Sequence, residues 1–187
     1  MRPSVMRPLV FVAACALAGC SQPVPAPKEF KEYHAPDGTF QCEYPAGWVT
    51  EGGGGSRTDY SMVKFNKGDA EIRVEADLAG SLFADIGRND GDAEPPVAKV
   101  HKLKIKRLDD EFTNYKEREA KPFSSKALGE GRKAVFVADG GIVGRIFGYH
   151  ATLLTNDKRI TIICQCSATD WKVLRPAFDR VIASFGR

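Results

Sequence analysis

Two segments near the C-terminus constrain the fold of this chain more than any other feature of the sequence. They cover Arg145–Leu154 and Arg159–Cys166, and both are rich in the β-branched and aromatic residues that favour strands. The pair Asn156-Asp157 lies between them and favours a two-residue turn, which sets Thr155 opposite Lys158. The sequence therefore predicts an antiparallel β-hairpin.

The register of this hairpin decides which side chains share a face of the sheet. It sets Tyr149 opposite Cys164, and it places Cys164 and Cys166 on one face. His150 falls opposite Ile163 on the other face. The two cysteines and His150 are therefore expected to point to opposite sides of the sheet.

Further strands are expected where apolar and polar residues alternate between turn residues. Tyr60–Asn66 and Ala70–Ala76 flank Lys67-Gly68-Asp69, which is typical of a hairpin with a short glycine-containing loop. Thr39–Tyr44 and Arg132–Ala138 also have strand character.

Two amphipathic helices are predicted from apolar residues spaced three or four positions apart. The first opens at Pro95-Pro96, and its stripe comprises Val97, His101, Ile105, Leu108, Phe112 and Tyr115. The charged residues between them, including Lys104, are expected on its solvated face. The second follows the capping segment Ser167–Asp170, and its stripe comprises Trp171, Leu174, Phe178, Val181, Ile182 and Phe185. Pro176 either kinks this helix or precedes a start near Arg175.

A mainly antiparallel sheet with helices packed on it satisfies every one of these segments. The expected fold class is therefore α+β.

The N-terminus resembles the signal peptide of bacterial lipoproteins. Arg2 and Arg7 precede the apolar segment Leu9–Leu17, which is too short to span a membrane, and Leu17-Ala18-Gly19-Cys20 has the form of a lipobox. The resemblance implies cleavage before Cys20 and attachment of diacylglycerol, with palmitate as the expected acyl chain. Two or three acyl chains hold a protein stably on a membrane. The implied location is the cell membrane or outer membrane, with the domain facing the periplasm or the exterior.

The expected organisation is a signal peptide over 1–19, a Pro-rich tether over 20–32 and one domain over 33–187. Of the 27 Lys and Arg residues, two leave with the signal peptide, so 25 remain against 24 acidic residues. A charge this close to neutral gives no electrostatic footprint for nucleic acid.

Three cysteines remain beyond Cys20 and the signal peptide. In an oxidising envelope, one disulfide is expected between Cys42 and either Cys164 or Cys166, with one thiol left buried and free. The alternative is three small buried side chains that never oxidise. Together with His150 these cysteines match the ligand types of zinc, but His150 points to the other face, so no metal site is expected there.

Several motifs resemble those of PsbP-like domains. They are Asp37-Gly38-Thr39-Phe40, Tyr44-Pro45-Ala46-Gly47-Trp48, a long central helix, a late hairpin, and Trp171 with Phe178 and Ser184-Phe185. This superfamily includes the extrinsic oxygen-evolving protein of photosystem II, a Ran-binding nuclear import factor and bacterial envelope lipoproteins. The resemblance implies an α/β/α sandwich and a noncatalytic adaptor or assembly role, with no catalytic residue and no cofactor.

Two functions remain open on the sequence. The first is a lipid-anchored, noncatalytic envelope module that binds a protein or peptide partner. The alternative is a thiol- or metal-handling envelope protein that uses Cys42, Cys164 and Cys166. His34 and His101 are expected to be incidental or packed rather than catalytic.

Overall fold

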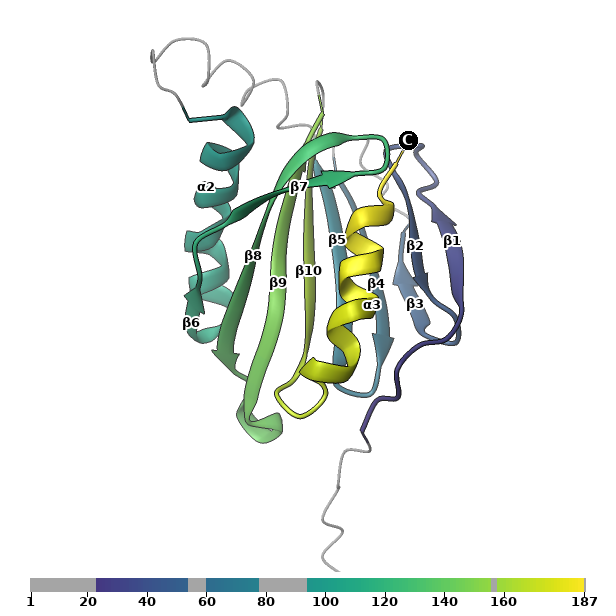
Figure 1. Ribbon diagram of the computed structural model, residues 1–187, viewed down its shortest axis with the longest axis vertical. Coiled ribbons are helices and arrows are strands. Elements are labelled where there is room, and N and C mark those ends of the chain that lie inside the picture. Colours follow the sequence, from purple (N-terminus) through teal and green to yellow (C-terminus); the bar gives the residue numbers. More distant parts are fainter. Residues whose placement is uncertain (1–22, 54–59, 78–93, 156–157, 187) are drawn as a thin grey trace, which may run out of the picture.

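The computed structural model describes residues 23–53, 60–77, 94–155 and 158–186. Within these residues, two helices pack on a mainly antiparallel sheet (Figure 1), which confirms the predicted α+β class. The helices are α2 (Pro96–Glu111), α3 (Trp171–Ser184) and the short 3-10 helix η1 (Gly141–Val143). The strands are β1 (Phe30–His34), β2 (Gln41–Pro45), β3 (Val49–Gly52), β4 (Tyr60–Lys67), β5 (Ala70–Asp77), β6 (Thr113–Glu117), β7 (Lys121–Ser125), β8 (Gly129–Asp139), β9 (Arg145–Leu154) and β10 (Arg159–Ser167).

The main sheet has the strand order β3-β4-β5-β10-β9-β8-β6, and β7 also pairs with β8. The ladders within the described residues are antiparallel. A separate hairpin of β1 and β2 lies against the end of α3, where the Glu43 backbone N–H donates to Ser184 Oγ at 2.8 Å.

The predicted register of the late hairpin is confirmed residue by residue. Tyr149 pairs with Cys164 and His150 pairs with Ile163, as the two-residue turn requires. The turn itself, 156–157, lies outside the described residues.

Neighbouring residues of β9 face opposite layers of the molecule. The hydroxyl of Tyr149 accepts a hydrogen bond from Arg175 Nε on α3 at 2.9 Å. The ring of His150 stacks on that of His101 on α2, with centroids 3.9 Å apart. Because successive strand residues point to opposite faces, α3 and α2 cover the two faces of the sheet.

The two layers differ in chemistry. The α3 layer is a large apolar core whose fully buried members include Phe65, Ile72, Ile162, Cys164, Leu174 and Phe178. The α2 layer has a smaller apolar cluster of Leu108, Tyr115, Phe136, Ala138 and Ile163. Beside it, the ammonium of Lys104 donates to Glu75 Oε2 at 2.6 Å, and both side chains are buried. The prediction that Lys104 is solvated is therefore wrong, because β5 supplies a buried carboxylate beneath this helix.

Two helix boundaries also differ from the predictions. The apolar stripe suggested that the first helix continues to Tyr115, but α2 ends at Glu111 and Phe112 is already extended. Tyr115 belongs to β6. The second helix starts at Trp171 and runs through Pro176 without a break in the helix assignment.

The folded part starts earlier than the predicted boundary at residue 33. Val24 is 4% exposed, and β1 begins at Phe30, so both lie inside the range expected to form a free tether. Leu17-Ala18-Gly19-Cys20, which resemble a lipobox, lie outside the described residues. In the part of the chain that the structure describes, no helix has the length and apolar character needed to span a membrane.

Candidate functional site: a buried His-Glu-His cluster beneath a groove

Three elements of the α2 layer each contribute one side chain to a buried cluster. α2 carries His101 on the face that packs against the sheet, β6 ends in Glu117, and β9 carries His150. The His101 and His150 residues are 1% and 0% exposed. Their ligand atoms and those of Glu117 all lie within 4.8 Å of one another.

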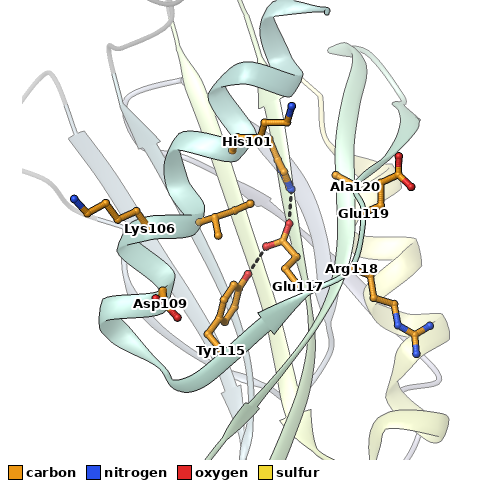
Figure 2. A pocket seen from close by; sticks show the side chains of 10 residues that line it. His101, Lys106, Asp109, Tyr115, Glu117, Arg118, Glu119 and Ala120 are labelled. Atoms are coloured by element: carbon orange, nitrogen blue, oxygen red, sulfur yellow. Dashed lines mark hydrogen bonds and ion pairs between the residues drawn. The ribbon is translucent and has the colours of Figure 1, made fainter.

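The carboxylate of Glu117 is the centre of this cluster. His101 Nε2 lies 2.8 Å from Oε1, and His150 Nδ1 lies 3.0 Å from Oε2. The hydroxyl of Tyr115 donates to Oε2 as well. Figure 2 shows Glu117 between His101 and Tyr115. With His150, three side chains from α2, β6 and β9 hold this carboxylate.

Thr152 closes the cluster from the opposite side. Its Oγ1 lies 2.9 Å from His101 Nδ1 and 3.3 Å from His150 Nε2. When each neutral imidazole donates its N–H to Glu117, both of these nitrogens must accept a hydrogen, and the threonine hydroxyl has only one. In that arrangement one of the two contacts lacks a hydrogen.

Burial and hydrogen bonding act in opposite directions on the charges here. Burial alone raises the pKa of Glu117, but the hydrogen bonds from His101 and His150 outweigh it and lower the pKa to about 2. Burial lowers the pKa of His150 to about 4, against the hydrogen bond to Glu117. Burial, reinforced by the hydrogen bond to Glu117, raises the pKa of Tyr115. At neutral pH the cluster therefore holds an ionised carboxylate and a neutral His150.

The same three side chains are a ligand set that zinc accepts, two imidazoles and one carboxylate. The two rings are nearly parallel, with an interplanar angle of 12°. Their in-plane lone pairs therefore run side by side instead of meeting at one point. A metal ion can be held only if one imidazole turns and gives up its hydrogen bond to Glu117.

An open groove of about 730 Å³ lies over His101 and Glu117, between α2 and the end of β6 (Figure 2). Its walls carry charges of both signs. The basic side chains are Lys102, Lys106 and Arg118, and the acidic ones are Asp109 and Glu119. A second hollow of about 300 Å³ shares His101 and continues toward Arg132. The buried cluster is thus reached from solvent through an open groove that has charged side chains on its walls.

Comparison with known proteins bears on the fold. No family model matches the sequence, and no curated protein matches it either. Among solved structures, cyanobacterial PsbP (CyanoP) from Synechocystis sp. PCC 6803, determined in solution, aligns with a TM-score of 0.60 at 15% identity, over 94% of this chain and 98% of that one. The fold is PsbP-like. PA94 from Pseudomonas aeruginosa, described as a protein of unknown function, aligns with a TM-score of 0.46 at 10% identity, over 83% of this chain and 94% of its own.

The PsbP-like fold does not bring the sequence-predicted residues together as one reactive site. Cys42, Cys164 and Cys166 are free and buried in the α3 layer, with His150 on the other face of the sheet, as the register predicted. Burial raises the pKa of Cys42 and of Cys166 to about 12 and that of Cys164 well above its usual value. Such thiols stay protonated and are poor nucleophiles. The predicted disulfide between Cys42 and Cys164 or Cys166 stays a prediction.

The His-Glu-His cluster itself was not predicted. His101 was assigned to the apolar stripe of a helix and His150 to the face away from the cysteines, and both assignments are confirmed. Glu117 gave no signal, because it lies on a short polar strand and matches no metal-binding motif. Placing the predicted helix over the face that carries His150 would have brought the two histidines together.

Proposed function

We propose that this chain is a lipid-anchored, noncatalytic binding module of the bacterial cell envelope, and that it binds a protein or peptide partner in the groove over His101 and Glu117. The lipobox at Leu17-Ala18-Gly19-Cys20 supports the anchor. The observation that carries the binding role is the groove itself, an open cavity with apolar and charged lining whose floor is fixed by a buried hydrogen-bond network.

The protonation of the floor supports binding rather than catalysis. A carboxylate with a pKa of about 2 is too weak a base, and at neutral pH too fully ionised, to act as a general acid or base. Both of its oxygens are already engaged by donors. Glu117 therefore orders the groove, and the exposed charges Lys106 and Asp109 are left to contact a partner.

The anchor is tested by mass spectrometry of the N-terminal peptide from membranes of cells that express the full chain. We expect a diacylglycerol adduct on Cys20 and none on a Cys20→Ser chain, which should remain an uncleaved precursor. An unmodified Cys20 in processed protein would contradict the anchor and leave the binding role untouched.

The binding role is tested by photocrosslinking in the native envelope. A benzophenone amino acid at Lys106 samples the groove, and the same group at Lys31, exposed on β1, is the matched control. We expect a reproducible crosslinked partner from position 106 and not from position 31. The same products from both positions, or none from either, would contradict binding in the groove.

A second candidate function is the handling of a divalent transition metal, which the ligand types and close spacing of His101, Glu117 and His150 favour but which requires one imidazole to turn out of the stack. It replaces the cysteine-based alternative, since the three thiols are buried and protonated. Calorimetric titration with Zn²⁺ tests it, with His101→Gln as the loss variant and His34→Gln, which alters an exposed histidine, as the control. Binding of one ion that His101→Gln abolishes and His34→Gln leaves unchanged supports metal handling. Absence of binding, or equal binding by the variants, excludes it.

A further inference from the structure

The start of the folded chain is fixed at one end of the domain. The Val24 backbone N–H donates to Asp170 Oδ2 at 3.3 Å, at the beginning of α3. Its side chain also lies against Gly68 in the β4–β5 turn, where a Cβ would come within 3.2 Å of Val24 Cγ2. Only four residues of chain lead from Cys20 to Val24, and four residues span at most about 14 Å. A lipid on Cys20 therefore holds this end of the domain close to the bilayer.

Exposed apolar side chains gather at the same end. Among the residues that the structure describes, the exposed large hydrophobic side chains are Val49, Leu103, Ile142 and Val173. Val173 lies in the first turn of α3, Ile142 lies in η1, and Val49 opens β3 directly after the β2–β3 turn. A hydrogen bond from the Ala168 N–H to the Arg145 carbonyl, 2.9 Å long, joins the β10–α3 loop to the residue that follows the η1 loop. Figure 1 shows η1, the β10–α3 loop and the start of the described chain at one end of the molecule.

Ile142 is the most exposed of these side chains, at 106%. It sits in a loop whose glycines, Gly141 and Gly144, adopt φ values of +60° and +74° and have open space where a Cβ would be. A single exposed apolar side chain is ordinary on a protein surface, but Ile142 lies at the end of the domain to which the chain from Cys20 leads.

Charges of both signs surround this end. Lys67, Arg145 and Lys172 are exposed and lie beside the apolar side chains, and basic residues beside apolar ones suit the boundary between anionic headgroups and acyl chains. The exposed Asp139 lies opposite Arg145 in the β8–β9 ladder, and Asp109 and Asp110 lie near the end of α2, on the other face of the sheet. The short chain from Cys20 to Val24, rather than the net charge, therefore argues for a lipid surface at this end.

We propose that this end of the domain rests on the membrane, with Ile142 inserted among the lipids as a second contact beside the Cys20 anchor. The inference rests on the proposed anchor. With this second contact the domain has a fixed orientation on the membrane. The groove beside α2 then lies on the face of the sheet opposite to α3 and Val24.

The test places a nitroxide spin label at Ile142→Cys, with Leu103→Cys on α2 as the matched control, on protein attached to phosphatidylcholine/phosphatidylglycerol vesicles. Attachment is through the native lipid or, in protein that starts at Cys20, through condensation of this N-terminal cysteine with an aldehyde phospholipid, which consumes its amine and thiol as a thiazolidine with loss of water and leaves the introduced thiol for the spin label. The geometry is thus tested whether or not Cys20 is acylated in the cell. The buried thiols Cys42, Cys164 and Cys166 are protected from labelling by their burial.

Oxygen concentrates in lipid, so we expect it to enhance the spin relaxation of the label at 142. We expect the accessibility of this label to a water-soluble nickel chelate to be about tenfold lower than that of the label at 103. Equal access of nickel to the two positions on vesicles overturns the proposal. Shielding of position 142 that arises only when envelope extract is added also overturns it, because a protein then covers this loop.

Discussion

Glu117 is the residue on which the arrangement of the cluster depends. Its two oxygens each accept from a different imidazole, and Oε2 accepts from Tyr115 as well. Among the described residues the Tyr115 hydroxyl donates to Glu117 alone, so loss of the carboxylate leaves buried donors without partners. One side chain therefore joins α2, β6 and β9.

Replacement of Glu117 by Gln is expected to destabilise the domain by about 2 to 4 kcal/mol, because an amide cannot accept three charge-assisted hydrogen bonds. Urea unfolding at pH 7 measures the loss. Glu119→Gln, which alters an exposed carboxylate beyond the same strand, is the control and should be nearly neutral. Similar losses for the two variants would mean that the cluster contributes little.

The pKa values give the stability of the domain a defined pH dependence. The pKa of His150 falls from 6.5 to about 4, and that of Glu117 falls from 4.5 to about 2. In both cases the unfolded chain binds more protons than the folded one, so the free energy of unfolding decreases as the pH falls. The contribution of His150 is lost from about pH 6.5 to 4 and that of Glu117 from about pH 4.5 to 2. Urea midpoints should therefore drop below pH 6.5, and His150→Gln should flatten the first part of the curve.

The three buried thiols are expected to resist alkylation in the folded protein, because burial raises the pKa of Cys42 and Cys166 to about 12. Mass spectrometry after iodoacetamide treatment at pH 8 should show them unmodified until urea is added. Unfolding then reveals three adducts if all are reduced and one adduct if Cys42 has paired with Cys164 or Cys166. Rapid modification of the native thiols would revive the thiol-handling alternative.

At the scale of elements, α2 is held to the sheet by buried ions as well as by apolar contacts. The Lys104 ammonium and the Glu75 carboxylate are 3% and 6% exposed, and Arg73 joins the same carboxylate and Glu111. A buried pair of this kind adds little compared with apolar residues, but either partner alone is costly. The pair therefore determines the position of α2 on the sheet more than it increases the stability of the domain.

Lys104→Met should cost up to about 3 kcal/mol, because the buried Glu75 carboxylate loses its ammonium and keeps only the 3.3 Å contact with Arg73 Nε. The double variant Lys104→Met/Glu75→Leu should recover most of this loss, since no charge is then left unpaired. Lys102→Met, on the exposed side of the same helix, is the control. Thermal or urea unfolding measures all three. A double variant as unstable as the single one would show that the pair itself stabilises α2.

The elements that the sequence predicted are those with a strong local pattern. The register of the β9–β10 hairpin was predicted correctly, because a two-residue turn fixes which residues pair. The alternation of side chains along a strand then fixes which face each residue occupies. The strand β3 was missed because all of its residues are exposed and it has no apolar face. The end of α2 was misplaced because Phe112 and Tyr115 continue the helical spacing by chance after the chain has become extended.

The candidate site was less accessible from the sequence than the fold, for a physical reason. Glu117 becomes significant only when β6 is placed beside β8 and under α2, which is decided by long-range packing and by no local motif. The resemblance of Leu17-Ala18-Gly19-Cys20 to a lipobox is different, because such a motif is linear and can be recognised without the fold.

At the scale of the whole molecule, the two faces of the sheet are closed by different means. The α3 face has a continuous apolar core that also includes the β1–β2 hairpin, whereas the α2 face combines a small apolar cluster with the Lys104–Glu75 pair and the histidine cluster. Apolar burial depends little on pH, but the polar contacts do. The two layers should therefore respond differently when the molecule is acidified.

This asymmetry has a kinetic consequence. Helices fastened by few apolar contacts open in brief local excursions, while those seated on a large core open only with the whole chain. Amide hydrogens of α2 should thus exchange with deuterium well before those of α3, and increasingly so below pH 6. In that case α2, which forms one wall of the groove, opens and closes locally at a rate that depends on pH, while the apolar core of the α3 layer stays folded.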